Sequence, residues 1–351
     1  MSGDVTSDNM TNDNFGVVGY SVNNHNIYLY KQDASVYKGV EQKWVSNGDN
    51  SGTWEYVNLA DLKFWPNNAM DFYAYFPYTD NATFAASNAT GEGVTSTTVM
   101  TITNVDCSHD VLFAFAGNQN KQQRVPLTFK HAFAKFMKLV IQMPSVGMLN
   151  QSGCQIEVKE VEFINTSTSG TINVDNSGVA SYASPNVTLK ETLVSPVTVN
   201  SANTSKALFD NGTNAKGYFF ATNSTTAAVN NVKGTGKPMW DGTKDALNSG
   251  KLSEKDFVCL KLTCKVWNGT SHYYVGSATV DDYGVIYIPL QGTDANSNSV
   301  TTFDAGKRYI YKIVMKDNVG YTDKGDPILT PILFRVYSVV GWKDVEVTIT
   351  L

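Results

Sequence analysis

The feature that most constrains the fold is a series of short apolar segments separated by turn-forming residues. Examples are Phe15–Val22, Ala69–Phe76 and Phe257–Trp267, and the stretch SNGDNSG at Ser46–Gly52 is typical of the turns between them. Strands that recur about every 8–12 residues with turn signals between them are characteristic of β-sandwiches. The pattern shows no alternation of helices and strands, which argues against a parallel α/β sheet. The sequence therefore predicts an all-β protein with Greek-key-type connections.

The length predicts two β-sandwich domains. The chain has 351 residues, and a domain holds roughly 150 residues on average. Residues 1–14 are polar and lack a periodic apolar pattern, so a flexible tail is expected there. The apolar pattern restarts near residues 183–187. We therefore expect an N-terminal β-sandwich domain at residues 15–182 and a C-terminal β-sandwich domain at residues 183–351.

The charge content excludes two classes of protein. Charged residues are 17% of the chain, and 27 Lys and Arg against 32 Asp and Glu give a net charge of −5. Without an excess of positive charge, nucleic-acid binding is not expected. No stretch reaches the roughly 18 consecutive apolar residues of a membrane-spanning helix. Hydrophobic residues make up 42% of the chain, enough to build cores, so disorder is excluded for most of it.

The first residues bear on the cellular compartment. The segment MSGDVTSDNMTNDN has neither a basic region nor an apolar run, so it is not a signal peptide. Either the protein is cytoplasmic, or its export signal has already been removed. The abundance of Asn, Thr and Ser beside few charges favours the second alternative, a cell-surface protein.

Motifs for catalysis and nucleotide binding are missing from the sequence. It contains no HExxH, GxSxG, GxxxxGK[ST] or strand-linked GxGxxG pattern. On a regular strand His131 shares a face with Phe129 and Phe133, so a core or boundary histidine is expected. Asp281 and Asp282 are adjacent and would point to opposite faces of a strand, which indicates a turn and not a glycosidase pair. We predict no catalytic residue and no cofactor.

A metal site is not predicted either. Asn173–Gly178 (NVDNSG) resembles half of a calcium loop, but its twelfth position is Ser184 instead of Glu. The chain has four cysteines, Cys107, Cys154, Cys259 and Cys264. They form no CxxC pair and have no histidine at metal-ligand spacing. Cys259 and Cys264 are expected on opposite faces of one strand, and the cysteines are expected to be buried free thiols.

The most aromatic segment, Phe64–Tyr78, has two interpretations. The first is a sugar-stacking platform in which Trp65 is exposed as a glycan contact. The second, which we favour, is a central strand packed on both faces. In that strand the side chains alternate, with Phe72 and Phe76 inward and Tyr73 and Tyr75 on the other face.

The long apolar run Val125–Met143 is predicted as one strand. Its alternation changes face near Ala134–Phe136, where Lys135 interrupts the apolar pattern. A change of face within a strand is what a bulge or bend produces, so we expect one at this place.

Six segments, in this order along the chain, resemble the fimbrillin-like (Mfa-like) cell-surface proteins of Bacteroides and related bacteria. Each segment alone is a weak signal, whereas the ordered set is fairly specific. The segments are Gly52–Tyr78, Thr101–Ala116, Val125–Met143, Tyr287–Gly292, Phe303–Met315 and Ile332–Leu351.

The resemblance implies two transthyretin-like β-sandwich domains, export as a lipoprotein and assembly into fimbriae at the outer surface. It also implies that proteolysis removes a strand near the N-terminus and that a strand from the next subunit fills the opened groove. Such an exchange is physically sound, because an incoming extended segment satisfies the backbone groups that the lost strand leaves unpaired.

Two segments are candidates for these parts, and for each the alternative is that it completes its own sandwich. The donor or final strand is expected at the C-terminus, on Val345, Val347, Ile349 and Leu351. The removable first strand is expected on Phe15, Val17, Val18, Tyr20 and Val22. No lipobox cysteine is present, and the first basic residue is Lys31, which does not fit Arg-specific processing. A tip or accessory subunit that does not polymerise therefore stays open.

The function expected from these observations is that of a non-enzymatic fimbrial subunit or adhesin at the cell surface and outer membrane. Its expected partners are other fimbrial subunits, and host or bacterial surface glycans or proteins, with membrane attachment only through a lipid anchor that has been removed. The alternatives are a surface glycan-binding protein or glycosidase that uses the exposed aromatic residues, and a stand-alone surface sandwich without a polymer.

Overall fold

The computed structural model is almost entirely β, which confirms the predicted fold class. The structure describes residues 5, 9–48, 51–88, 98–106, 109–121, 124–143, 153–166, 169–183, 189–210, 218–220, 222–223, 231–269, 272–315, 319–329, 332–336, 343–345 and 348–350.

Two sheets form the first half of the molecule. The strands of sheet 1 are β1 (Phe15–Ser21), β2 (Ile27–Leu29), β5 (Val40–Ser46), β6 (Gly52–Tyr56), β7 (Met70–Phe76), β10 (Leu112–Gln119) and β11 (Lys130–His131). They are ordered β11-β10-β7-β1-β5-β6, with β2 paired to β1. The strands of sheet 2 are β3 (Lys31–Asp33), β4 (Val36–Lys38), β8 (Ala82–Phe84), β9 (Thr98–Asp106), β14 (Ser169–Asp175) and β15 (Ala180–Ala183). Their order is β15-β14-β9-β8-β4-β3.

Two more sheets form the second half. The strands of sheet 3 are β12 (Ala134–Gln142), β17 (Ser205–Asp210), β18 (Tyr218–Phe220), β22 (Gly292–Thr293), β23 (Ser299–Val300), β24 (Lys307–Met315), β25 (Ile332–Val336), β26 (Lys343–Val345) and β27 (Thr348–Thr350). They are ordered β17-β12-β24-β25-β27-β22-β23, with β18 on β12 and β26 on β24. The strands of sheet 4 are β13 (Cys154–Ile164), β16 (Leu189–Val199), β19 (Cys259–Asn268), β20 (His272–Val275) and β21 (Gly284–Pro289). Their order is β16-β13-β19-β20, with β21 on β19.

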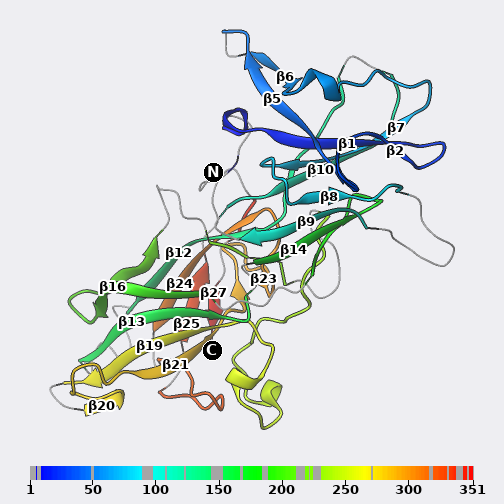
Figure 1. Cartoon of the computed structure of the whole chain (residues 1–351). Helices are drawn as coiled ribbons and strands as arrows, with labels where there is room; N and C mark the ends of the chain where they lie inside the picture. Colours follow the sequence, from blue (N-terminus) through cyan, green and yellow to red (C-terminus); the bar gives the residue numbers. More distant parts are fainter. Residues whose placement is uncertain are drawn as a thin grey trace.

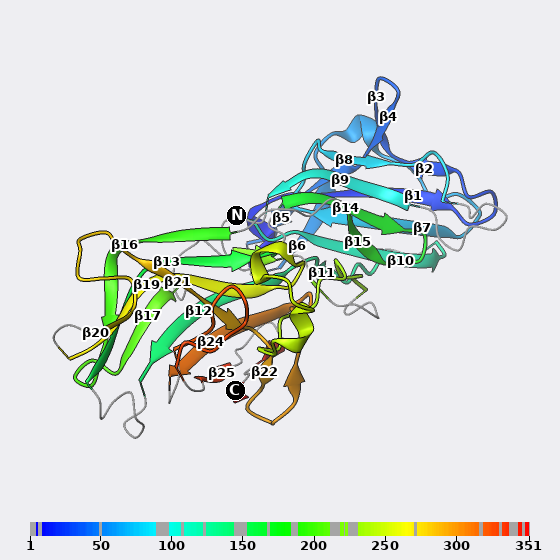
Figure 2. The ribbon, with the colours of Figure 1, turned by 90° about the horizontal axis from the view of Figure 1, so that it is seen from below.

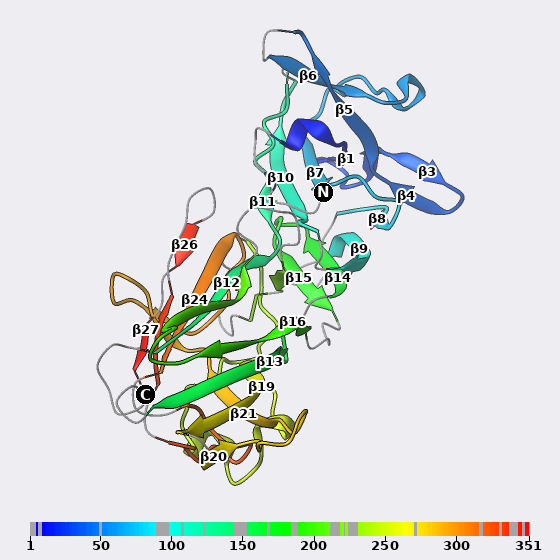
Figure 3. The ribbon, with the colours of Figure 1, turned by 90° about the vertical axis from the view of Figure 1, so that its left-hand side faces the viewer.

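Helical structure in the described residues is limited to single 3-10 turns. These are η1 (Met10–Asn12), η2 (Leu59–Asp61), η3 (Asp245–Leu247) and η4 (Leu252–Glu254). Within that part of the chain, no helix is long and apolar enough to cross a membrane. Figure 1 shows the two halves end to end, and the views in Figures 2 and 3 agree.

Sheets 1 and 2 face each other across a core that is rich in tyrosine. Tyr20, Tyr73 and Tyr75 extend from sheet 1 into the same buried cluster as Met100 and Ile172 of sheet 2. Each tyrosine hydroxyl donates a hydrogen bond to a backbone carbonyl outside its own strand: Tyr20 to Ala85 O at 2.8 Å, Tyr73 to Asn176 O at 2.9 Å and Tyr75 to Thr79 O at 3.1 Å. Because their hydroxyls are hydrogen-bonded, these large rings are buried without the free-energy cost of an unpaired polar group.

Strand β7 is packed on both faces, as predicted, but the faces are opposite to the prediction. Tyr73 and Tyr75 point into the core between the sheets, whereas Phe72 and Phe76 lie in a separate cluster on the outer face of sheet 1. Space for Tyr75 comes from Gly16 of the neighbouring strand, where a Cβ would overlap the tyrosine ring. A Cβ at Gly39 would overlap the same ring, so the two glycines together provide the room that Tyr75 occupies.

The second half has a larger core between sheets 3 and 4. Phe136 of β12 lies at the centre of an aromatic group, with ring centroids 4.6 Å from Phe163 and 5.4 Å from Tyr311. Aliphatic residues of sheet 4, such as Leu260 and Leu262, complete the cluster. Rings at these separations gain contact energy beyond the burial of their area.

The run Val125–Met143, predicted as one bent strand, is divided between the two halves. β11 pairs with β10 in sheet 1, whereas β12 pairs with β24 in sheet 3. The chain passes from one half to the other at Ala132 and Phe133: Ala132 N–H donates to Val111 O at 2.8 Å, and Phe133 O accepts from Gly306 N–H at 2.9 Å. The prediction of one continuous strand was therefore wrong, because backbone groups on either side of this point have partners in different sheets. The predicted bulge is present within β12, whose pairing with β24 shifts register between Phe136 and Lys138.

Sheet membership does not follow the order of the sequence. β12 and β13 precede residue 183 but belong to sheets 3 and 4, and the chain then returns to sheet 2 for β14 and β15. Figure 2 shows β14 and β15 with the strands of the first half. The division at residues 182 and 183, the transthyretin-like topology and the flexibility of residues 1–14 stay predictions. Within residues 1–14, η1 is formed and Val5 is buried.

Candidate functional site

The strand predicted to be removable lies inside sheet 1. β1 pairs with β7 along Gly16–Ser21 and, on its other edge, with β5 and β2. All seven of its residues are buried. Four of the predicted residues, Phe15, Val17, Val18 and Tyr20, lie in β1, and Val22 follows its end, where Val22 N–H donates to Ala69 O.

The side chains of β1 contribute to two separate cores. Val18 and Tyr20 belong to the cluster between sheets 1 and 2, whereas Phe15 and Val17 belong to the cluster on the outer face. Removal of this strand would therefore leave a gap between β7 and β5 and take apolar side chains from both faces at once. That geometry is what an acceptor of a foreign strand requires.

The predicted C-terminal strand is divided into two short strands. Val345 ends β26, which pairs in parallel with β24, and Ile349 lies in β27, where it pairs with Phe334 of β25. β27 also contacts β22 through Thr293. Val347 and Leu351 lie outside the described residues. The assignment of this segment as donor or final strand stays a prediction.

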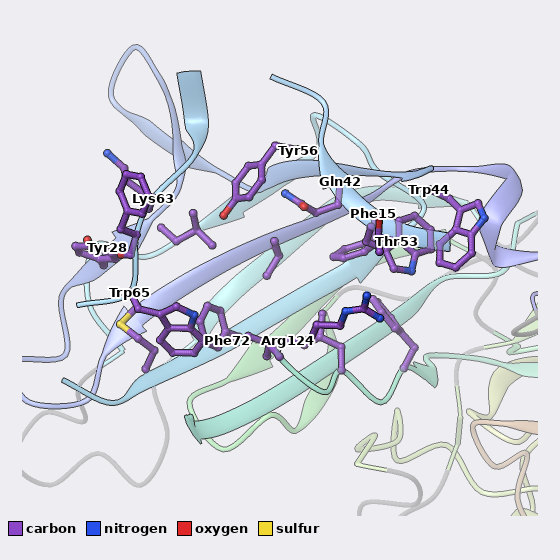
Figure 4. Close-up of a pocket in the computed structure, with 18 of the residues that line it drawn as sticks. Phe15, Tyr28, Gln42, Trp44, Thr53, Tyr56, Lys63, Trp65, Phe72 and Arg124 are labelled. Atoms are coloured by element: carbon purple, nitrogen blue, oxygen red, sulfur yellow. Dashed lines mark hydrogen bonds between the residues drawn. The ribbon is translucent and has the colours of Figure 1, made fainter. Parts of the chain in front are cut away.

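A groove of about 650 Å³ runs over the outer face of sheet 1 (Figure 4). Its floor is the outer face of β1 and β7, and its walls are the β5–β6 hairpin, residues 63–66 and residues 124–129. Among the described residues, nine aromatic side chains line it: Phe15, Tyr28, Trp44, Trp54, Tyr56, Phe64, Trp65, Phe72 and Phe129.

The hairpin wall is built by a pair of tryptophans. Trp44 and Trp54 are directly opposite each other on β5 and β6, with ring centroids 5.6 Å apart and planes at 65°. Trp54 in turn packs edge to face on Phe15, at 4.9 Å. Gly52 allows this packing, since a Cβ there would lie 2.5 Å from the Trp44 ring. Cross-strand aromatic pairs of this kind stabilise a two-stranded ribbon.

Trp65, the predicted glycan contact, lies in the opposite wall. Its ring packs edge to face on Phe72, with centroids 5.7 Å apart, and it is half-buried. The loop that carries it is held by the Tyr28 hydroxyl, which donates to Phe64 O at 2.9 Å. Contact of Trp65 with a glycan stays a prediction.

Few polar groups face the groove. Gln42 is 7% exposed, and its Nε2 atom has no hydrogen-bond partner in the described part of the chain. Lys63 and Arg124 are the charged side chains of the lining, and no ion pair joins either to another described residue. The sequence did not predict the roles of Gln42, Lys63 and Arg124 in this groove. It also did not predict the pair Trp44 and Trp54, although two tryptophans that flank the turn Ser46–Gly52 could have indicated a cross-strand pair.

The other sequence candidates have structural roles. His131 Nδ1 lies 2.8 Å from Oδ2 of Asp110, a fully buried carboxylate that also accepts from Val5 N–H at 3.2 Å. Its predicted boundary position is confirmed, although it lies in the short strand β11. Asp281 and Asp282 lie in the predicted turn, and a hydrogen bond from Lys159 lowers the pKa of Asp281.

No metal site is found in the described residues either. In the segment that resembles a calcium loop, Asp175 Oδ1 accepts from the backbone N–H groups of Ser177 and Val179, both at 2.9 Å, and closes the β14–β15 turn. These bonds occupy one of the two carboxylate oxygens of Asp175 and give the segment a role in closing the turn.

Three of the cysteines are buried free thiols, as predicted. Cys259 and Cys264 point to opposite faces of β19, the first toward a small cluster with Trp240 and the second into the core of sheets 3 and 4. Burial raises the pKa of Cys154 to about 11 and that of Cys259 to about 12, so both stay protonated at neutral pH. Cys107 lies outside the described residues.

Comparison with known proteins found one matching family model and several similar solved structures. The model of a family described as fimbrillin-like matches residues 5–326. A fimbrial protein from Bacteroides vulgatus is 16% identical, with a TM-score of 0.47 over 86% of this chain and 88% of that one. The fimbrial anchor protein Mfa2 from Porphyromonas gingivalis is 8% identical, with a TM-score of 0.29 over 94% and 90%. Comparison with curated proteins found no match.

Proposed function

Because this chain belongs to the fimbrillin-like family, we propose that it is a fimbrial subunit that accepts a strand from a neighbouring subunit in place of β1. Membership of the family gives it a fimbrial or cell-adhesion role at the cell surface, and the family is one of structural and adhesion proteins, not of enzymes. The finer parts of the proposal are strand exchange, export as a lipoprotein and attachment at the outer membrane.

The observation that carries the proposal is the position of β1. It is a central strand, hydrogen-bonded on both edges and buried on both faces. Each hydrogen bond contributes about 0.5–1.5 kcal/mol, and each large apolar side chain about 1.5–3 kcal/mol. An empty β1 position is therefore strongly unfavourable, and a foreign strand with the same alternation relieves it.

Cleavage on the C-terminal side of β1 tests the proposal. A protease site inserted between Asn23 and Asn24, both exposed in the β1–β2 turn, lets the fragment that carries β1 leave after cutting. We expect the cut protein to form ladders on unheated denaturing gels and larger masses by light scattering. The matched control has the same site between Val280 and Asp281, also exposed, where cutting releases no short strand and should leave the protein monomeric.

Two outcomes would count against strand exchange. If the β1 fragment dissociates and the remainder stays monomeric, the chain is a tip or accessory subunit that does not polymerise. If the control cut also gives ladders, polymerisation does not depend on β1.

The donor strand is tested at the other end of the chain. We propose that the segment Val345–Leu351 supplies it, because alternate residues there are apolar. Deletion of Thr348–Leu351 should abolish the ladders of the protein cut at the β1–β2 turn. Because β27 also pairs within its own sheet, the deletion could act by disturbing that sheet, and a second measurement is needed. A synthetic peptide of Val345–Leu351 is added to protein that is cut at the β1–β2 turn and keeps its C-terminal residues. It should cap the polymers and shorten the ladders, whereas a peptide of scrambled order should not; unchanged ladders in both experiments would exclude this donor.

A further inference from the structure

Two exposed aromatic residues are part of the lining of the groove on the outer face of sheet 1. Phe64 is 82% exposed and Tyr28 is 36% exposed. Phe64 belongs to the loop between β6 and β7 and Tyr28 to strand β2, and the Tyr28 hydroxyl joins the two by its bond to Phe64 O. Exposed apolar side chains that gather at a groove mark a binding site more often than isolated ones do.

The β5–β6 wall of the groove has an amide that needs a partner. Gln42 Nε2 is buried and unpaired within the described residues, and Figure 4 shows the side chain directed into the groove beside Tyr56. Buried donors in folded proteins almost always have an acceptor. A ligand with an oxygen acceptor would supply it.

The charged side chains of the lining favour a ligand of one sign of charge. Lys63 and Arg124 are cationic, and no carboxylate is part of the lining formed by the described residues. Arg in particular binds a carboxylate through two parallel hydrogen bonds. The groove therefore favours an anionic group on an otherwise apolar molecule.

The shortage of polar side chains in the groove disfavours two ligand classes. A peptide of matching length brings an N–H and a C=O group with every residue, and a glycan brings several hydroxyls with every sugar. Besides Gln42 and the two cations, the lining offers the side-chain hydroxyls of two threonines and two tyrosines, and the hydroxyl of Tyr28 already donates to Phe64 O. An acyl chain needs polar partners at one end alone.

We infer that the groove binds a monomeric long-chain fatty carboxylate, with its acyl chain along the aromatic walls and its carboxylate at the end of the groove that holds Gln42 and Arg124. A volume of about 650 Å³ is within the ordinary range of small-molecule sites. This activity goes beyond fimbrial assembly and does not depend on strand exchange.

Intrinsic fluorescence of the full, uncut chain tests the inference, because three of its six tryptophans, Trp44, Trp54 and Trp65, line the groove. Octanoate, decanoate and dodecanoate are titrated below the concentrations at which they form micelles. We expect saturable changes in fluorescence and an affinity that rises roughly threefold to fourfold with each added methylene. Dodecanol should bind at least tenfold more weakly than dodecanoate, because it lacks the anionic group.

Variants locate the site. Phe64→Asp and Arg124→Gln should each weaken dodecanoate binding at least fivefold, and Gln42→Leu should weaken dodecanoate more than dodecanol. The matched control is Val280→Asp, which places the same acid on an 84% exposed apolar residue of the second half and should leave the affinity unchanged. Thermal unfolding of each variant checks that the fold is retained.

Four results would overturn the inference. They are an affinity independent of chain length, equal binding of dodecanol and dodecanoate, equal loss in Phe64→Asp and Val280→Asp, and binding to phosphatidylglycerol vesicles without binding of monomeric dodecanoate. None of these measurements involves cleavage at β1, so failure here leaves the strand-exchange proposal standing.

Discussion

The two faces of sheet 1 are made by alternate residues of the same strands, yet they are covered in different ways. The inner face lies against sheet 2, and its tyrosine hydroxyls find backbone acceptors at 2.8–3.1 Å. The outer face is covered by a hairpin and two loops, which leave a groove and the unpaired amide of Gln42. The tyrosine hydroxyls of the inner face are thus hydrogen-bonded, whereas the outer face keeps open space and an unpaired donor that a ligand can use.

The largest expected contrast comes from removing one ring from each face. Phe113→Ala removes a ring that is 1% exposed from the inner face and should lower the free energy of unfolding by about 3–5 kcal/mol. Phe129→Ala removes a half-buried ring from the wall of the groove and should lower it by about 1–2 kcal/mol, because less area is lost. Urea denaturation of both variants gives the two values, and equal losses would remove the distinction between the faces.

Gly16→Ala tests how tightly the inner face is packed. The new Cβ overlaps the Tyr75 ring, so we expect a loss of about 1–3 kcal/mol in unfolding free energy from overpacking. Combined with Tyr75→Leu, the substitution should cost less than the sum of the two single changes, because the ring that it strikes is gone. Additive losses in a double-mutant cycle would show that the glycine is needed for another reason.

Alkaline pH should weaken the inner face. Burial, above all, raises the pKa values of Tyr20 and Tyr75 above the ordinary value near 10. The folded protein then holds protons that the unfolded chain releases, so stability is complete below about pH 10 and falls above it, by about 1.4 kcal/mol per pH unit for each such tyrosine. Unfolding measured from neutral to alkaline pH gives this slope. Tyr20→Phe should reduce it, Tyr274→Phe on an exposed site should not, and a flat profile would contradict the prediction.

The smallest effects should differ in sign between the faces. Tyr73→Phe removes a satisfied hydroxyl on the inner face and should lower the unfolding free energy by about 0.5–1.5 kcal/mol. Gln42→Leu removes an unpaired buried amide on the outer face and should leave that free energy unchanged or raise it by up to about 1 kcal/mol. Thermal denaturation of the two variants measures both, and a loss in Gln42→Leu as large as that in Tyr73→Phe would show that the amide is satisfied in the ligand-free protein.

Alternation within single strands could be predicted from the sequence. The strand Met70–Phe76 and the opposite faces of Cys259 and Cys264 follow from a period of two, which depends on neighbouring residues alone. The direction in which Tyr73 and Tyr75 point was assigned wrongly, because it depends on which sheet covers each face and on the room that other segments leave, as Gly16 and Gly39 do for Tyr75. The alternation of residues within one strand does not show how much space a neighbouring strand leaves for their side chains.

The sequence did not predict which strands pair with one another. The residues on either side of Ala132 continue the same apolar pattern, yet β11 and β12 belong to different sheets. The groove was missed for the same reason, since its walls come from three segments that are apart in the sequence. Trp65 was found because it stands in an aromatic run, whereas Gln42 has no local signal and becomes notable through burial without a partner.

The passage of the chain between the halves has a consequence for synthesis. β12 is made early, but its parallel partner β24 begins at Lys307, and β13 has to wait for β19 at Cys259. By the time β15 completes sheet 2 at Ala183, two long apolar strands have emerged without the partners that cover them. Newly made chains with such strands are prone to aggregate, and neither half can be obtained by shortening the gene from one end, because the strands of the two halves alternate along the chain.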